Sequence, residues 1–277
     1  LDRIREILDS LQGLPVLVLG DVMLDIYLSG RVERISPESP VPVVVVEARE
    51  QRLGGAANVA RNIAALGGRP RLLAMRGEDA TGLELVACLE KRGISAEDLV
   101  CDSDRPTSVK TRILGAGQQV CRYDSEMRKP AEGSILAELE RRALASLEEV
   151  KAVVLSDYGK GVLVDELVEK VVAAARERGV PVVVDPKEGH FSAYRGVDLV
   201  TPNKVEAGAS YGLPIRSDED LETVGAGLQE RLGLGALMIT LGDDGIALLE
   251  VDGPSRRLPA HAPPAFDVTG PRAPGAA

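Results

Sequence analysis

The chain has 277 residues, 44% of them hydrophobic, which is enough to build a substantial core in one large domain or two smaller ones. Its 33 lysines and arginines are outnumbered by 43 aspartates and glutamates, and the net charge of −10 provides no basic field for nucleic acid or anionic lipid. The apolar runs fall far short of the roughly 20 residues that span a bilayer. These totals favour small-molecule chemistry and predict neither a nucleic-acid nor a membrane partner.

The cysteines and histidines exclude several further kinds of site. Cys88, Cys101 and Cys121 form no Cys-x-x-Cys pair and are odd in number, so neither a disulfide framework nor a zinc site is expected. His190 and His261 are too few for a histidine metal cluster and offer little to a Ser-His-Asp triad. The cysteine pattern fits a reducing compartment, and we expect a cytoplasmic protein.

The order of strand-like and helical patterns predicts an α/β fold with a central, mostly parallel sheet flanked by helices. Strands are expected at residues 15–20, 70–75, 151–156, 181–185, 197–202 and 235–242. Core helices are expected at residues 56–66, 81–92, 133–148, 162–178 and 218–232. The N-terminus carries an apolar stripe opposite its charges and predicts a surface helix. We expect a single domain over residues 1–277.

Two regions interrupt this alternation. Residues 25–50 and 105–124 are rich in Val, Ile, Thr and Tyr, carry Gly or Pro turns and lack a helical period. They predict a small β-sheet, the lid, that projects from the core. Such a sheet either closes over a ligand at the carboxyl ends of the parallel strands or extends an edge that serves dimerisation. The two roles are compatible.

Polar and small residues follow the first predicted strand and precede the first core helix. Asp21 and Asp25 lie where α/β sheets place ligand-contacting loops, and a carboxylate there can accept hydrogen bonds from sugar hydroxyls, although both also suit a turn or cap. Gly54 and Gly55 directly precede a helix, so backbone amides can approach a ligand while Asn58 faces it from the first turn. Packing of a slim helix against the sheet explains the small residues just as well.

Two further strand ends carry residues suited to a phosphorylated ligand. Asp157 and Lys160 follow the strand at residues 151–156 and reach the same edge of the sheet. Asn203 and Glu206 open a short helix with a spacing of i, i+3. That pair is either a capping box, which needs no ligand, or a device that organises magnesium-bound water near phosphates.

Residues 239–250 read as a strand, a glycine-containing loop and a second strand. Thr240 and Gly242 offer a hydroxyl and free space to a nucleotide phosphate, whereas the alternative is an ordinary hairpin turn through Asp244 and Gly245. None of these motifs decides the function individually. Their order along the chain is more informative.

In this order the motifs resemble the ribokinase-like carbohydrate kinase family, and more narrowly its bacterial heptose 7-phosphate kinase branch. The stretch "GDVMLDIYLSGRVERISPESPVPVV" is similar to the first strand and flap of that branch, "RLGGAANVARNIAALGG" to its glycine pair and helix, and "SDYGKGVL", "DPK" and "TPNKVEA" to its later blocks. The resemblance covers nearly the whole chain. The combination of "ISPESPVPVV" and "LGGAANVA" is more specific than any single glycine pattern.

The resemblance implies a ribokinase-like fold with a β-sheet lid, and phosphorylation by ATP and Mg²⁺ of the anomeric hydroxyl of D-glycero-D-manno-heptose 7-phosphate. The product would be the 1,7-bisphosphate on the route to lipopolysaccharide heptose, and a homodimer through the lid is expected as well. The implied sugar-phosphate ligands are Asp25, Gly54, Gly55, Asn58, Lys110, Arg112, Arg122 and Asp157. The implied ATP ligands are Asn203, Lys204, Val205, Glu206, Thr240 and Gly242, with Glu206 holding Mg²⁺ through water.

The last twelve residues, "FDVTGPRAPGAA", depart from the family pattern. The family's anion hole continues as Ala-Gly-Asp, whose Asp is the general base, and the part of the anion hole that is retained here consists of Asp267, Thr269 and Gly270. The three following places hold Pro271, Arg272 and Ala273. Proline lacks a backbone donor and alanine cannot accept a proton. We therefore expect no catalytic base, impaired activity, and a domain whose end is missing after about residue 270.

Two alternatives stay open at this stage. One is a kinase for another sugar, such as fructose or ribose, and the other is a non-catalytic protein that binds a sugar phosphate or a nucleotide. A dinucleotide-binding dehydrogenase is not expected, because no Gly-x-Gly-x-x-Gly follows the first strand.

Overall fold

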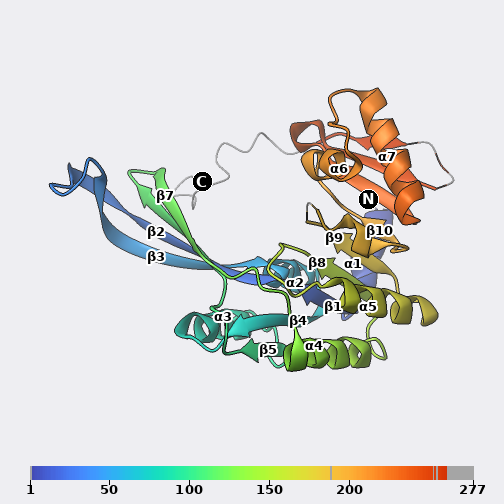
Figure 1. Cartoon of the computed structure of the whole chain (residues 1–277), viewed down its shortest axis with the longest axis horizontal. Coiled ribbons are helices and arrows are strands. Elements are labelled where there is room, and N and C mark those ends of the chain that lie inside the picture. The colour runs from blue at the N-terminus through green and yellow to red at the C-terminus, as the bar shows by residue number, and fades with distance from the viewer. Residues whose placement is uncertain (1, 188, 252, 254, 261–277) are drawn as a thin grey trace.

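The structure is a computed structural model and describes residues 2–187, 189–251, 253 and 255–260. These residues form a nine-stranded, mostly parallel sheet covered by helices, and a separate four-stranded sheet that projects from it (Figure 1). The predicted α/β class is confirmed, as is the second, smaller sheet.

The central sheet runs in the order β13-β12-β11-β10-β9-β8-β1-β4-β5. Its strands are β1 (Pro15–Gly20), β4 (Arg69–Gly77), β5 (Leu99–Asp102), β8 (Ala152–Ser156), β9 (Val182–Asp185), β10 (Leu199–Val200), β11 (Ala236–Thr240), β12 (Ile246–Glu250) and β13 (Arg256–Leu258). The strands from β11 to β5 are parallel, whereas β12 and β13 continue the sheet in antiparallel pairs. The carboxyl ends of the parallel strands, and the polar residues that follow them, therefore meet along one edge.

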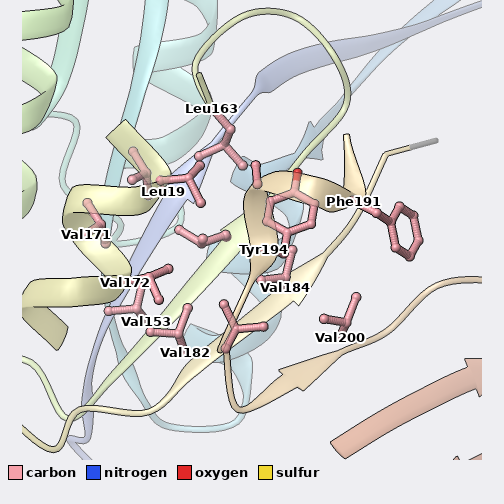
Figure 2. Packing of buried hydrophobic residues seen from close by; sticks show 14 of the residues in the cluster. Leu19, Val153, Leu163, Val171, Val172, Val182, Val184, Phe191, Tyr194 and Val200 are labelled. Carbon is pink, nitrogen blue, oxygen red and sulfur yellow. The ribbon is translucent and has the colours of Figure 1, made fainter. Parts of the chain in front are cut away.

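Helices lie on both faces of this sheet. They are α1 (Asp2–Ser10), α2 (Ala56–Ala65), α3 (Ala80–Glu90), α4 (Gly133–Ser146), α5 (Asp165–Glu177), α6 (Lys204–Tyr211) and α7 (Asp218–Leu232). On one face α2 and α3 contribute to an apolar cluster, and on the other α4, α5 and α7 contribute to a larger one. Figure 2 shows part of the larger cluster, where Val153, Val182 and Val184 of the sheet lie near Val171 and Val172 of α5. No described helix has the length and apolar character needed to cross a membrane.

The two faces of the sheet from β8 to β12 differ in coverage. Side chains such as Val153 and Leu237 are fully buried in the cluster formed with α4, α5 and α7. The residues that alternate with them are only half-buried, namely Ala152, Val154, Val183, Leu199, Ala236, Met238, Ile246 and Leu248. The strand register aligns four of these into one row, formed by Val154, Val183, Leu199 and Ala236. One face of the sheet thus carries an apolar row that the described helices leave half-exposed.

The lid consists of β2 (Val22–Ile35), β3 (Pro42–Gly55), β6 (Val109–Gly115) and β7 (Gln118–Ser125), in the order β3-β2-β6-β7. The long β2–β3 hairpin extends away from the core (Figure 1), and β6 joins it by parallel pairing with β2. These strands cover the predicted regions 25–50 and 105–124 and extend beyond them to the start of α2. Toward the far end of the lid, several apolar side chains are exposed, namely Val32, Ile35, Val41, Val45 and Val46.

The structure adds details that the sequence patterns do not predict. β5 and β13 are edge strands of four and three residues, too short to produce a clear pattern. The predicted helix at 162–178 begins only at Asp165, because residues 158–162 form a loop around a buried carboxylate. The predicted N-terminal surface helix is present as α1, which buries none of its residues.

Candidate active site

The two carboxylates that follow β1 have opposite surroundings. Asp21 is 1% exposed, and its carboxylate accepts the amides of Tyr158 and Lys160, both at 2.9 Å, and of Val162 at 3.1 Å. Burial raises the pKa of Asp21, although these three amides oppose the rise. Asp21 thus shapes the loop after β8, which is the structural one of the two roles that the sequence allows.

Asp25 instead belongs to the lid, where it bonds to Arg112 and lies beside the glycine pair. A Cβ atom on Gly54 would lie 2.5 Å from Asp25 Oδ2, so only glycine allows the carboxylate to approach so closely. Gly55 has a φ of 58°, and a Cβ there would lie 2.2 Å from the Asp21 carbonyl oxygen. The two glycines let the lid strand turn into α2 next to both carboxylates.

Asn58 lies in the first turn of α2, directly after this glycine pair. It is half-buried, and its side chain has no hydrogen-bond partner within the described part of the chain. Its amide is therefore available to a ligand that binds beside the glycine pair. That ligand role stays a prediction.

The part of the lid next to the core, the lid root, is polar on one face and apolar on the other. Two alternate rows of the strand register, which share one face, carry the polar residues: Asp25, Lys110 and Asp124 in one row, and Tyr27, Arg112 and Arg122 in the other. Residues opposite one another in a sheet project from the same face. The other face contributes to the apolar cluster of α2 and α3 with the residues Leu24, Ile26, Leu53 and Val109.

The two predicted phosphate-binding arginines already have carboxylate partners. Arg112 Nη1 lies 2.5 Å from Asp25 Oδ1. Arg122 donates to both oxygens of Asp124, at 3.0 and 3.1 Å. A phosphate that binds here would therefore share each guanidinium with a carboxylate.

Lys110 differs from these arginines because it makes no ion pair with a described residue. It lies on the polar face between Asp25 and Asp124, each of which is bonded to an arginine. Burial and the positive charge of Lys160 lower the pKa of Lys110. An incoming anion would offset both effects, so Lys110 is the predicted phosphate ligand whose position best suits that role.

Asp157 is buried beneath the same edge, with its side chain 3% exposed. Its Oδ1 accepts the amide of Gly159 at 2.7 Å, and its Oδ2 is bonded to His190 Nδ1 at 2.8 Å and to the Tyr194 hydroxyl. Burial alone would raise the pKa of Asp157, but the hydrogen bonds from His190, Tyr194 and Gly159 outweigh it and lower the pKa. Figure 2 shows the Tyr194 ring within the apolar cluster, beside Val184. Direct sugar contact by Asp157 stays a prediction, since these partners already occupy its carboxylate.

Two residues at these strand ends were not among the predicted ligands. Burial and the negative charges of Asp185, Asp25 and Glu206 raise the pKa of Tyr158, which places its hydroxyl in the electrostatic reach of all three. Burial, with the charges of Glu206 and Asp157, raises the pKa of Asp185 to about 6. Asp185 could have been recognised as a site residue from the "DPK" block. Tyr158 could have been recognised only from its position next to Asp157.

Asn203 and Glu206 form a complete capping box at the start of α6. Asn203 Oδ1 accepts the amides of Val205 and Glu206, both at 2.9 Å, and Glu206 Oε2 accepts the amide of Asn203 at 2.9 Å. The structural alternative for this pair is thus realised. A role of Glu206 toward water-bound Mg²⁺ is compatible with the cap and stays a prediction.

The remaining predicted ATP ligands surround the start of α6 and the end of β11. Lys204 and Val205 line an apolar hollow of about 440 Å³ on α6. Thr240 bridges to Asn203 across the sheet edge. Gly242 has a φ of 65° and begins the short 3-10 helix Gly242–Asp244 between the antiparallel strands β11 and β12, so the hairpin alternative is also realised. Phosphate contact by these residues stays a prediction.

The described residues contain no group of three or more His, Cys, Asp or Glu side chains that could hold a metal ion by themselves. Mg²⁺, however, keeps several waters and is commonly bound through one or two carboxylates together with substrate phosphates. The charge of Glu206 contributes to the raised pKa of Asp185, so these carboxylates repel each other and a hydrated cation near them would relieve that repulsion. The residues thus fit Mg²⁺ bound together with ATP. The C-terminal residues Asp267, Thr269, Gly270 and Ala273 lie outside the described part of the chain.

Polar side chains along the carboxyl edge, a glycine pair before α2 and a lid with one polar face define a ribokinase-like α/β protein. The structure of Arabidopsis thaliana ribokinase complexed with ribose and ATP shares this fold, with a TM-score of 0.71 at 20% identity, covering 93% of this chain and 80% of that one. Phosphofructokinase-2 from Escherichia coli in complex with fructose-6-phosphate does so with a TM-score of 0.70 at 21% identity, covering 92% and 81%.

The sequence profile of the pfkB family carbohydrate kinases matches residues 15–270, and the chain belongs to this family. It is therefore related to enzymes that transfer a phosphoryl group to a sugar. It is 41% identical to the bifunctional protein HldE of Syntrophotalea carbinolica, over 97% of this chain and 55% of that protein. It is 46% identical to the HldE protein of Pseudomonas syringae pv. syringae, over 92% and 52%. The chain spans about half the length of these curated relatives.

Proposed function

We propose that this chain phosphorylates the anomeric hydroxyl of D-glycero-D-manno-heptose 7-phosphate at the expense of ATP, giving the 1,7-bisphosphate used for lipopolysaccharide heptose. The observation that carries the proposal is the 41–46% identity to HldE proteins across more than nine-tenths of the chain. Because the chain spans about half of those relatives, the proposal concerns the kinase reaction alone. A kinase for another sugar and a non-catalytic binding protein are the alternatives that the experiments below separate.

The polar face of the lid root supports a phosphorylated acceptor. The Asp25 carboxylate accepts hydrogen bonds from sugar hydroxyls, and the Asn58 amide donates to them or accepts from them. Both lie near Gly54 and Gly55, where a ligand can approach closely. Lys110 binds the existing phosphate, with Arg112 and Arg122 next to it in the register. The ammonium group of Lys110, which makes no ion pair with a described residue, favours an acceptor that already carries a phosphate over an unphosphorylated sugar.

The edge formed by β9, α6 and β11 supports the nucleotide. Bound ATP supplies the phosphoryl group, and Mg²⁺ neutralises charge on its phosphates. Asp185 and Glu206 hold the hydrated cation, and Asn203, Lys204 and Val205 lie along the nucleotide at the start of α6. Thr240 and Gly242 contact it from the end of β11.

Residue 273 sets the rate in this proposal. The resemblance to the family implies a general base at the place of Ala273, so in this proposal the chain binds both substrates but transfers the phosphoryl group slowly. Replacing Pro271→Ala, Arg272→Gly and Ala273→Asp should increase ADP formation about 10²–10⁴-fold, because general base catalysis typically contributes a factor of that size. Equal activity before and after the replacement would show that the base lies elsewhere.

Acceptor specificity is tested by calorimetric titration, which does not require turnover. We expect heptose 7-phosphate to bind the printed chain at least ~10-fold more tightly than unphosphorylated heptose, since a hydrogen bond to a charged group contributes about 1.5–3 kcal/mol. Lys110→Met should remove most of this preference. Equal affinity for fructose 6-phosphate, or for ribose, would favour a different sugar kinase.

We also propose a homodimer through the lid. The far end of the lid exposes Val41, Val45 and Val46 by 51%, 44% and 49%, and such an unpaired apolar region is stabilised by covering it. Escherichia coli phosphofructokinase-2, whose fold is similar, has been solved in a tetrameric form. Val45→Asp should shift the chain from dimer to monomer in analytical ultracentrifugation without lowering its melting temperature, whereas a monomeric wild type would contradict the proposal.

A further inference from the structure

In the loop between β8 and α5, residues 157–163, backbone amides donate hydrogen bonds to carboxylates of the protein itself. The amides of Tyr158, Lys160 and Val162 all donate to the Asp21 carboxylate. The amide of Gly159 donates to Asp157. This loop therefore offers a ligand its side chains, chiefly Tyr158, and its usefulness depends on how firmly that side chain is positioned.

Arg105 holds the same loop from the opposite side. It is 9% exposed and lies between β5 and β6, where the chain enters the lid. Its guanidinium donates to the carbonyl oxygen of Lys160 at 3.2 Å, to that of Lys129 at 2.6 Å, and to the Asp102 carboxylate at 2.9 Å. Lys129 follows β7, where the chain leaves the lid. One buried side chain thus connects both ends of the β6–β7 hairpin with the loop after β8.

Other contacts at the same place strengthen this connection. Lys160 Nζ lies 2.5 Å from Glu126 Oε2, and the two side chains are only 8% and 14% exposed. The carbonyl oxygen of Gly161 accepts a hydrogen bond from the amide of Ala131 at 2.8 Å. A Cβ on Gly161 would lie 2.1 Å from the Lys129 carbonyl oxygen. The chain leaving the lid and the loop after β8 are therefore packed backbone to backbone.

We propose that Arg105 is a positioning residue for acceptor binding, which fixes the loop carrying Tyr158 to the lid root so that the two sides of the acceptor site keep one geometry. The proposal rests on the sugar kinase activity of the family and does not depend on which sugar is phosphorylated. Without Arg105 the loop loses one of its two buried anchors, so its amides separate from Asp21 more often and its distance from the polar lid face is no longer fixed. Tyr158 would then meet the acceptor in several arrangements.

Amide hydrogen exchange tests the coupling without any ligand. In Arg105→Gln, protection of the amides of Tyr158, Lys160 and Val162 should fall about tenfold to a hundredfold, the range expected when a hydrogen bond to a charged group is lost. Arg105→Lys, which keeps the charge but cannot reach both carbonyl oxygens, should lose less. Amides of β1 should be unchanged in both variants, which also shows that each variant folds.

Arg71→Gln is the control, because Arg71, like Arg105, donates to a carboxylate, here Asp98 at 2.7 and 3.3 Å, but does not contact the loop. This control should leave protection of the loop amides at the wild-type level. Unchanged loop protection in Arg105→Gln would overturn the proposal. So would an equal loss in the loop and in β1, which would show a general loss of stability.

Calorimetric titration then separates the acceptor from the nucleotide. Arg105→Gln should weaken binding of the sugar phosphate about tenfold or more and leave binding of a non-hydrolysable ATP analogue within about twofold. Equal weakening for both ligands would overturn the positioning role. If the wild type binds neither heptose 7-phosphate nor fructose 6-phosphate, the proposed acceptor is wrong, and the exchange experiment alone decides the role of Arg105.

Discussion

The loop after β8 and the edge formed by β9 and α6 both lie at the carboxyl end of the central sheet, but their carboxylates have different surroundings. In and beneath the loop, Asp21 and Asp157 each accept three hydrogen bonds from the protein. At the edge, Asp185 has no side-chain hydrogen bond to a described residue and lies within electrostatic reach of Glu206. The first region is complete without a ligand, and the second is not.

The pKa values of two buried carboxylates show the consequence of this difference. Burial would raise the pKa of both, but hydrogen bonds from His190, Tyr194 and Gly159 outweigh it at Asp157, and the pKa of that group is lowered. At Asp185 the neighbouring negative charges add to burial and raise the pKa to about 6. Hydrogen bonds to the charged form favour ionisation, and like charges oppose it. The loop therefore uses its carboxylates to hold the backbone, whereas the edge has negative charge that a cation can compensate.

The largest expected effect comes from removing the Asp21 carboxylate, which holds the loop after β8. Asp21→Ala leaves the amides of Tyr158, Lys160 and Val162 without their acceptor in a buried position. Each unsatisfied donor costs about 1–3 kcal/mol, so the free energy of unfolding should fall by about 3 kcal/mol or more. Urea denaturation followed by circular dichroism measures this change.

Asp25→Ala is the control for that measurement. Asp25 follows the same strand and makes an ion pair with Arg112, but its side chain is 19% exposed and water can replace the lost partner. The expected loss is about 1 kcal/mol or less. The interpretation of Asp21 as the centre of the loop would be wrong if the two substitutions had equal costs.

Most elements of the central sheet could be predicted from the sequence, but the different surroundings of its carboxylates could not. The alternation of apolar runs and helical patterns predicts the strands β1, β4, β8, β9, β10 and β11 and the helices between them. Each of these elements has an apolar run or an amphipathic period within its own short segment. The orientation of Asp21 and Asp25 has no such local origin. The amides that turn Asp21 inward come from residues 137 to 141 positions later. Either role is therefore compatible with the short motif that contains both.

The same limit applies to the site as a whole. Gly54, Gly55 and the Asn203–Glu206 box are recognisable because a short segment determines their geometry. Arg105 belongs to no recognisable pattern, and Tyr158 lies in the "SDYGKGVL" block without a role that the block reveals, since their importance arises only where the lid root meets the loop after β8. The cations of the lid could be named from the sequence, but only the side-chain contacts show that Arg112 and Arg122 have carboxylate partners and that Lys110 has none among the described residues.

An intermediate effect is expected from the charge of Asp185, at the edge formed by β9 and α6. The pKa of Asp185 is raised from 3.8 to about 6 in the folded chain, so between about pH 4 and 6 the folded state binds more protons than the unfolded state. Stability should therefore fall as the pH rises through that window. After allowance for the partial exposure of Asp185, the loss at neutral pH is about 1–2 kcal/mol.

Asp185→Asn removes this pH dependence. Its melting temperature should exceed that of the wild type at pH 7.5 and differ little at pH 4, where the wild-type carboxyl is protonated. Addition of Mg²⁺ and an ATP analogue at pH 7.5 should narrow the gap, because the cation compensates the charge of the wild-type carboxylate. A difference that is the same at both pH values would show that the substitution acts through packing and not through charge.

The smallest effect is expected at Glu206, whose cap and charge act in opposite directions. Glu206→Gln weakens the bond to the Asn203 amide, which costs about 0.5–1 kcal/mol, but it also removes the repulsion that raises the pKa of Asp185. The net change in stability should be below about 1 kcal/mol, and carbon NMR should show the Asp185 pKa moving down toward its usual value.

Asp220→Asn separates the cap of Glu206 from its proposed ligand role. Asp220 occupies the same place in the capping box of α7, where its carboxylate accepts the amides of Arg216 and Ser217 at 2.9 Å, away from the strand ends of the proposed site. Asp220→Asn should lower the melting temperature slightly more than Glu206→Gln does, because no relief of repulsion offsets its weakened cap. Only Glu206→Gln should weaken the magnesium-dependent binding of an ATP analogue in calorimetric titration. If neither substitution changes that affinity, the cap explains Glu206 completely, and the cation is held by other groups.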